Sequence, residues 1–375
     1  MKSRLCAALL LAAVLPVVAA CGRGSQEKAE SQQPPDNVAK PKWADLFFPP
    51  NGYVYFNGPQ LKPSDPPEQK AHWLVDAAIL AYGCHRDENA GPTCQFYSDA
   101  ELQSQFVRGG FTDFQTFGDW RDEHGFVTAE HKGGTQAFFA KRDDWAILSF
   151  RGTEKGDPSD LPTDLDIDPV RWNNGAMLTG PRVHRGFKSG LERIWPEVSA
   201  AVAKFRQDHP TAEVSITGHS LGGALANVAA ASLASDPNLS LYTFGCPFTG
   251  NPEFNQIVRT NVKDHWYRYV DGNDLVAHVP PGVPPLLPYV QYPPARHVGT
   301  RELQDSISGT LLTLSRALGH DLQLTSFTAI QKTVEDSLQW FKPGNVPPSS
   351  QEIPGNLADL ADHCPSRYLY YVWHQ

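Results

Sequence analysis

The feature that most constrains this fold is a glycine-flanked serine, Gly-His-Ser-Leu-Gly at 218–222, placed between two different periodicities. The β-branched run 214–217 before it is typical of a buried strand, and the alanine-rich run 221–235 after it is typical of a helix. Glycines on both sides leave room for a serine held in a strained turn from strand to helix. The pattern therefore predicts a nucleophile elbow, with Ser220 as the candidate nucleophile.

Strand-like and helical patterns alternate through the rest of the chain. Apolar residues recur at helical spacing over 68–82 and 187–207, and two further helical stripes between 302 and 341 predict an inserted αα-hairpin. The other strand-like runs are 126–130, 136–140, 145–150, 240–245 and 265–270. Strands that alternate with helices predict an α/β fold, a mostly parallel sheet with helices on both faces.

Residues 1–20 are typical of an export signal, because two basic residues precede an apolar run that is too short to span a bilayer. The following Val-Ala-Ala-Cys-Gly at 18–22 resembles the bacterial lipobox, whose cysteine thiol receives a diacylglycerol. This resemblance implies lipidation at Cys21 and a lipid-anchored protein of the bacterial cell envelope, in the outer membrane because glycine follows the cysteine. An ordinary signal that leaves Cys21 free is the alternative.

The charge balance limits the classes of partner that the chain is expected to bind. Acidic residues outnumber basic ones 41 to 32, for a net charge of −9, so we expect no nucleic-acid partner and no polybasic membrane contact. The lipid anchor is the expected link to a membrane. The polar segment 21–42 has no apolar period and predicts a flexible tether, so one folded domain is expected over 43–375. The oligomeric state stays open.

Cysteine usage agrees with export. Outside the signal and the lipobox, four cysteines remain: Cys84, Cys94, Cys246 and Cys364. An even number in an oxidising compartment predicts disulfides, and Cys84–Cys94 is favoured because it closes a short loop containing glycine and proline. Four buried free thiols are the alternative.

The longer run Thr-Gly-His-Ser-Leu-Gly-Gly-Ala-Leu-Ala at 217–226 resembles the fungal-type, or class 3, lipase family. Phe-Arg-Gly-Thr at 150–153 ends the strand-like run before it and matches the family motif that supplies an oxyanion-hole donor. The resemblance implies an α/β-hydrolase-like fold. It also implies that the backbone amides of Thr153 and Leu221 hold the oxyanion.

A serine nucleophile needs a histidine base and an acid that orients it, and the chain order in this fold is serine, acid, base. Asn-Asp-Leu-Val at 273–276, followed by two prolines, is similar to the acid segment of the family. Asp274 is the predicted acid, with Asp271 as the alternative.

Four of the histidines that follow this acid remain plausible by chain order: His278, His297, His320 and His363. His278 is too close to the acid in sequence, and His297 fits a structural role. The segment Asp-His-x-Pro-x-x-Tyr around His363 is similar to the family's histidine segment, and Pro365 suits the first turn of a closing helix over 366–373. His363 is therefore the predicted base, and His320 between the two helical stripes is the alternative.

The resemblance implies a serine hydrolase that cleaves carboxylic esters of lipids, as a triacylglycerol lipase does. Phospholipase A1, short-chain carboxylesterase and a catalytically silent surface-binding lipoprotein are the alternatives. The segment after the oxyanion motif is acidic where the family has an apolar lid, which argues against activation at oil droplets, and the proline-rich run 283–288 is expected to rim the acyl site. The acidic spacing at 164–168 fails as a calcium loop, and neither a metal nor a cofactor is expected.

Overall fold

The computed structural model describes residues 48–49, 51–86, 94–118, 135–152, 168–173, 180–272, 274, 276–278, 289–290, 292–299 and 362–375. Several predictions lie outside the described residues: the signal, Cys21 and the tether, the run 126–130, Thr153, nearly all of the acidic segment after it, the run 283–288, the hairpin at 302–341 and His320.

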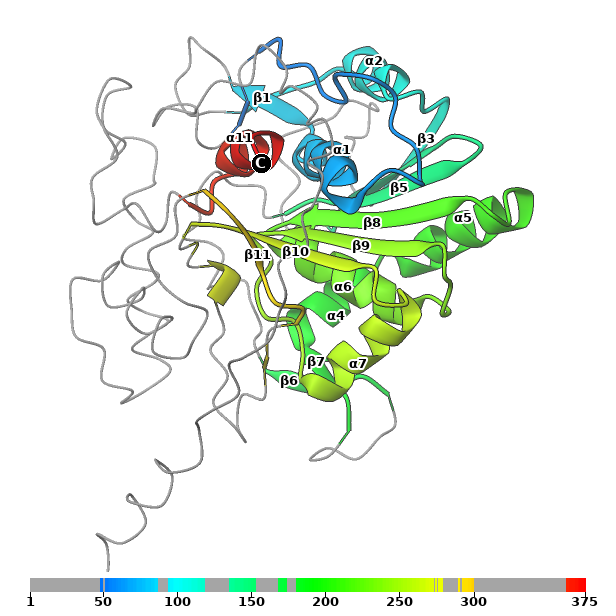
Figure 1. The fold of residues 1–375 in the computed structure, drawn as a ribbon. Helices are drawn as coiled ribbons and strands as arrows, with labels where there is room; N and C mark the ends of the chain where they lie inside the picture. The colour runs from blue at the N-terminus through cyan, green and yellow to red at the C-terminus, as the bar shows by residue number, and fades with distance from the viewer. Residues whose placement is uncertain are drawn as a thin grey trace, which may run out of the picture. The chain divides into compact units, whose positions relative to one another are not determined.

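A seven-stranded sheet carries the candidate site (Figure 1). Its strands are β3 (Asp113–Phe117), β4 (Ala137–Lys141), β5 (Trp145–Phe150), β8 (Glu213–His219), β9 (Leu239–Phe244), β10 (Trp266–Asp271) and β11 (Arg296–Val298). Their order is β11-β10-β9-β8-β5-β4-β3. Strands β5, β8, β9, β10 and β11 pair with one another in parallel. At the other edge, β4 pairs antiparallel with β5, and β3 pairs antiparallel with β4. The predicted mostly parallel sheet is confirmed.

Helices cover both faces of this sheet, as predicted (Figure 1). They are α1 (Pro67–Leu80), α2 (Asp99–Arg108), α4 (Arg185–Glu192), α5 (Trp195–Asp208), α6 (Leu221–Ser232), α7 (Pro252–Asn261), α11 (Pro365–Trp373) and the short 3-10 helix η2 (Val276–His278). The core on one face contains α1 and α11, and the core on the other contains α4 to α7. Strands β5 and β9 are buried at every residue, as expected for strands covered on both faces.

The prediction of one helix over 187–207 is wrong. Helix α4 ends at Glu192 and α5 begins at Trp195. Pro196 is the physical reason, because its ring fits the first turn of a helix but breaks a helix interior.

The two further strand pairs are β1 (Cys84–Arg86) with β2 (Cys94–Phe96), and β6 (Pro169–Arg171) with β7 (Arg182–His184). Cys84 is disulfide-bonded, whereas Cys246 and Cys364 are buried free thiols, so the alternative of four free thiols is wrong. In the antiparallel pairing of β1 with β2, Cys84 lies opposite Phe96 and Cys94 lies opposite Arg86, and the Cys84–Cys94 bridge stays a prediction.

A buried carboxylate connects the start of the described body to its end. Asp76 in α1 accepts hydrogen bonds from the Tyr53 hydroxyl at 3.0 Å, the Phe56 amide at 2.7 Å and the Trp373 indole at 3.1 Å. Three donors satisfy a group that would otherwise be costly to bury. The bond from Trp373 holds the end of α11 against α1, and the other two hold residues 53–56 there.

Within the described part of the chain, no helix combines the length and the apolar character that crossing a bilayer requires.

Candidate active site

Ser220 occupies the turn between β8 and α6 in a strained conformation, with φ 58° and ψ −130°. A residue with a side chain rarely adopts this region, so the surrounding structure must enforce it. A Cβ at position 218 would lie 2.3 Å from the Gly222 carbonyl carbon, and one at position 222 would lie 2.1 Å from the Phe150 carbonyl oxygen. The two glycines therefore allow the tight turn that the sequence pattern predicted.

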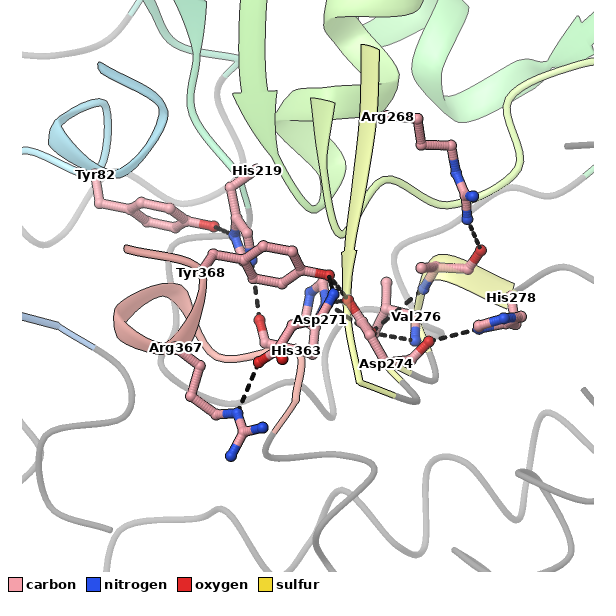
Figure 2. Close-up of polar contacts among 11 residues, drawn as sticks. Tyr82, His219, Arg268, Asp271, Asp274, Val276, His278, His363, Arg367 and Tyr368 are labelled. Atoms are coloured by element: carbon pink, nitrogen blue, oxygen red, sulfur yellow. Dashed lines mark hydrogen bonds and ion pairs between the residues drawn. The ribbon is translucent and has the colours of Figure 1, made fainter. Parts of the chain in front are cut away.

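His363 lies against a buried carboxylate from the end of β10. Its Nδ1 is 3.0 Å from Oδ1 and 2.9 Å from Oδ2 of Asp274, which has no exposed surface (Figure 2). An ionised carboxylate only accepts hydrogen bonds, so Nδ1 carries the proton and the neutral ring keeps its basic lone pair on Nε2. This tautomer is the one that a general base next to a serine requires.

Other donors hold the carboxylate of Asp274 in place. The Tyr368 hydroxyl donates to Oδ2 at 2.5 Å, and the Val276 amide donates to Oδ1 at 2.8 Å. Burial raises the pKa of Asp274, but the charge and hydrogen bond of His363 and the bond from Tyr368 together hold that pKa below its ordinary value. The acid is therefore ionised at neutral pH.

The alternative acid, Asp271, has a different partner. Its Oδ2 accepts a hydrogen bond from Arg367 Nε at 2.8 Å, and Arg367 also pairs with Asp362 at 2.5 Å. The Asp271 amide donates to the Tyr368 hydroxyl at 3.1 Å. Of the two candidate acids, the structure brings Asp274 to the histidine and places Asp271 in an ion pair beside it (Figure 2).

The carboxyl ends of three neighbouring parallel strands, β8, β9 and β10, meet at this dyad. Gly245, just after β9, has φ +58°, and a Cβ there would lie 2.8 Å from Asp274 Oδ2 and 3.0 Å from His363 Nδ1. The Ser220 amide donates to the carbonyl of Phe244 at 2.9 Å. Residues 244–245 therefore lie next to both Ser220 and the dyad.

Several buried side-chain atoms at this end of the sheet have no hydrogen-bond partner among the described residues. They include Ser220 Oγ, His363 Nε2 and Asp271 Oδ1. Buried polar atoms are nearly always paired, and a catalytic role is one explanation for an unpaired one. In enzymes without bound substrate, the serine–histidine contact is often long and tightens only in the complex.

The first amides of α6 supply candidate donors for an oxyanion. Leu221 is the first residue of the helix, where amides have no intrahelical acceptor and the helix dipole favours negative charge. The strand end that leads to residue 153 passes close by, because a Cβ on Gly152 would lie 2.9 Å from the His219 carbonyl oxygen.

The remaining histidine candidates have other surroundings. His278 Nδ1 donates to the Asp274 carbonyl at 2.6 Å, and His297 lies in β11. No group of His, Cys, Asp and Glu able to hold a metal ion occurs in the described ranges.

Four residues that hold this site together were not predicted from the sequence. Tyr368 and Arg367 belong to the histidine segment, where only a tyrosine five residues after the histidine signalled a role. His219 was part of the elbow motif, but no role was assigned to it. Tyr82 follows α1 and belongs to no motif, yet its hydroxyl reaches His219 at 2.8 Å.

Comparisons with known proteins converge on one family. The family model described as "Lipase (class 3)" matches residues 147–283. The chain is 41% identical over 106 residues to a secreted mono- and diacylglycerol lipase 1 of Fusarium solani, covering 28% of this chain and 32% of that protein. It is 37% identical over 125 residues to a lipase of Rhizomucor miehei, covering 32% of this chain and 33% of that protein.

These matches span about a third of the length of each curated relative. Among solved structures, lipase II from Rhizopus niveus is 26% identical with a TM-score of 0.45, covering 63% of this chain and 81% of that one. The resemblance to class 3 lipases is thus supported by the family model and by curated relatives.

Proposed function

We propose that this chain is a serine hydrolase that cleaves the carboxylic esters of lipids, with Ser220 as nucleophile, His363 as general base and Asp274 as the acid that orients it. One observation carries the proposal. The Nδ1 of His363 is bound by a buried carboxylate, while its Nε2 and the Oγ of Ser220 are buried and unpaired. Such a histidine can take a proton only through Nε2.

The reaction follows from these groups. As Ser220 Oγ attacks the ester carbonyl carbon, its proton moves to Nε2 of His363 and the carbonyl oxygen becomes an oxyanion. The amides of Leu221 and Thr153 hold that charge. The C–O bond to the alcohol then breaks, and the alkoxide leaves with the proton from His363. Water, deprotonated by the same nitrogen, attacks the acyl carbon; the ester bond to Ser220 then breaks, Ser220 Oγ takes that proton from His363, and the carboxylic acid leaves.

Lipid esters are the substrate class that the relatives favour. The similar Fusarium solani protein is named for mono- and diacylglycerols, and the Rhizomucor miehei protein is named a lipase. Triacylglycerols and partial acylglycerols are therefore the first substrates to test.

The exported, lipid-anchored location belongs to the same proposal. The lipobox-like residues at 18–22 support acylation of Cys21 in a bacterial envelope, and the outer membrane follows from the glycine after the cysteine. The disulfide at Cys84 is typical of an oxidising compartment outside the cytosol.

The test measures hydrolysis by the full chain in detergent micelles, with short- and long-chain p-nitrophenyl esters, emulsified acylglycerols and phospholipid vesicles. We expect acylglycerol hydrolysis that falls about 10³-fold or more in Ser220→Ala. Hydrolysis of phospholipid alone would change the assignment to a phospholipase. Hydrolysis of short-chain esters alone would change it to a carboxylesterase. No hydrolysis of any ester would contradict the proposal.

A further inference from the structure

A chain of two hydrogen bonds connects α1 to the backbone of His363 through the residue next to the nucleophile. The Tyr82 hydroxyl lies 2.8 Å from His219 Nδ1, and His219 Nε2 lies 2.9 Å from the carbonyl oxygen of His363 (Figure 2). A carbonyl can only accept, so Nε2 carries the ring proton. Nδ1 of the neutral ring then accepts from the Tyr82 hydroxyl.

His219 is unsuited to act as the base itself. Both of its ring nitrogens are engaged, and burial together with the neighbouring His363 lowers its pKa to about 3. Its ring is stacked on the ring of His363, with centroids 4.8 Å apart and 29° between the planes. His219 therefore stays neutral while the other histidine gains and loses a proton.

We propose that His219 and Tyr82 are positioning residues that set the distance between the nucleophile and the base. This inference rests on the proposed function. The contact with Asp274 fixes one edge of the His363 ring, and the bond from His219 fixes the backbone that carries the ring. Since His219 directly precedes Ser220 in the chain, the same bond ties the base to the elbow.

The position of the Tyr82 hydroxyl supports this role. A Cβ on Gly152 would lie 2.1 Å from Tyr82 Oη, so the hydroxyl occupies space that only glycine leaves open. Gly152 lies between Phe150 at the end of β5 and the proposed oxyanion donor Thr153. The buried Tyr82 hydroxyl thus lies against both Gly152, which leads to this donor, and His219, which bonds the backbone of His363.

The test compares two replacements of the same histidine. In His219→Gln the amide nitrogen takes the place of Nε2 and keeps a donor for the His363 carbonyl. In His219→Asn the shorter amide keeps an acceptor near Tyr82 but cannot reach that carbonyl. We expect kcat for a short-chain ester to fall about 10²-fold in the Asn variant, as misplacement by about 1 Å does, with KM within about twofold. The kcat of the Gln variant should be at least about tenfold higher than that of the Asn variant.

Tyr82→Phe with Tyr53→Phe as its matched control covers the case in which the asparagine variant does not fold. Both remove a buried tyrosine hydroxyl that donates a hydrogen bond, but Tyr53 donates to Asp76 instead of to the site. We expect lower kcat in Tyr82→Phe only, with a loss of melting temperature in both.

Equal kcat in His219→Asn and the wild type, or in Tyr82→Phe and Tyr53→Phe, would overturn the positioning role. An inactive wild type would instead overturn the proposed function, so the two failures are distinguishable.

Discussion

Asp274 is the residue on which the account of the site depends most, because its charge fixes the tautomer of His363. Asp274→Asn puts an amide that can donate next to Nδ1 and favours the tautomer with its proton on Nε2. We expect kcat for a short-chain ester to fall about 10³- to 10⁴-fold with little change in KM. Asp271→Asn is the matched control, since this carboxylate faces Arg367, and it should lose less than about tenfold. Equal losses in the two variants would contradict the assignment of the acid.

Tyr368 gives a prediction about pH at the same scale. The lowered pKa of Asp274 stabilises the fold above the ordinary pKa of a carboxyl, and that contribution is lost as pH falls through the lower folded-state value. Tyr368→Phe removes a bond that lowers this pKa. The free energy of unfolding should therefore drop more at about pH 7 than at about pH 2, which lies below the ordinary pKa of a carboxyl, as urea titrations of both proteins would measure. A larger drop at the acidic pH would contradict the ionisation assigned to Asp274.

At the scale of elements, the elbow depends on close contact between the start of α6 and the end of β5. A Cβ on Gly222 would lie 2.1 Å from the backbone oxygen of Phe150, so Gly222→Ala must push the helix away from the strand. We expect a loss of about 3 kcal/mol in the free energy of unfolding, at the upper end for overpacking, as measured by urea titration. Ester hydrolysis should fall with it because Leu221 moves.

Gly190→Ala in α4 is the control for this change. A Cβ there would meet only side-chain atoms, Thr135 Oγ1 at 3.2 Å and Leu225 Cδ2 at 3.3 Å, and shifts of a few tenths of an ångström relieve both contacts. Alanine also favours the helix by up to about 1 kcal/mol, so this variant should remain within about 1 kcal/mol of the wild type. Similar losses in both variants would show that the close contact at the elbow is not the cause.

Local pattern was enough to predict the elements that form the elbow. The β-branched run before Ser220 and the alanine-rich run after it gave β8 and α6 nearly at their observed bounds. The break before Pro196 was missed because the apolar stripe continues through it. Of the two edge strands, β11 has only three residues, and β3 carries three polar residues on a partly exposed edge.

The acid and the base were predicted from short motifs, but their supports were not. Tyr82 and His219 are 137 residues apart, and His219 and His363 are 144 apart. No local period or spacing encodes such contacts. They follow from the sheet order and from the packing of α1 and α11 on one face.

At the scale of the whole molecule, Asp76 couples the two ends of the described body. Burial raises its pKa to about 7, although the donors Trp373, Phe56 and Tyr53 oppose the rise. Between the ordinary pKa of a carboxyl and about pH 7, Asp76 is therefore protonated in the folded chain but ionised in the unfolded chain. Its favourable effect on stability is present at low pH and is lost as pH rises through about 7.

Trp373→Phe tests this connection. The indole bond is made to a charged carboxylate above about pH 7 and to a neutral carboxyl below it, and bonds to charged groups contribute about twice as much. We expect a loss of unfolding free energy of about 1–3 kcal/mol that is greater at about pH 8.5 than at about pH 5.5. Equal losses at both values would mean that Asp76 keeps one charge state throughout.

The proposed lipid anchor at Cys21 predicts a behaviour of the whole chain. Cys21→Ala removes the thiol that would be acylated, so the protein should move from the detergent phase to the aqueous phase after phase separation. It should also lose incorporation of labelled palmitate, while ester hydrolysis per molecule stays at the wild-type level. A variant that remains in the detergent phase would contradict a lipid anchor at this residue.

The central claim, that Ser220 is activated by His363, is tested most directly by covalent labelling with a fluorophosphonate read by intact mass. The full chain in detergent is compared with its Ser220→Ala, His363→Ala and His320→Ala variants. We predict one label on the wild type and on His320→Ala, and none on the other two. Absence of label on the wild type, or its loss in His320→Ala with retention in His363→Ala, would contradict the account.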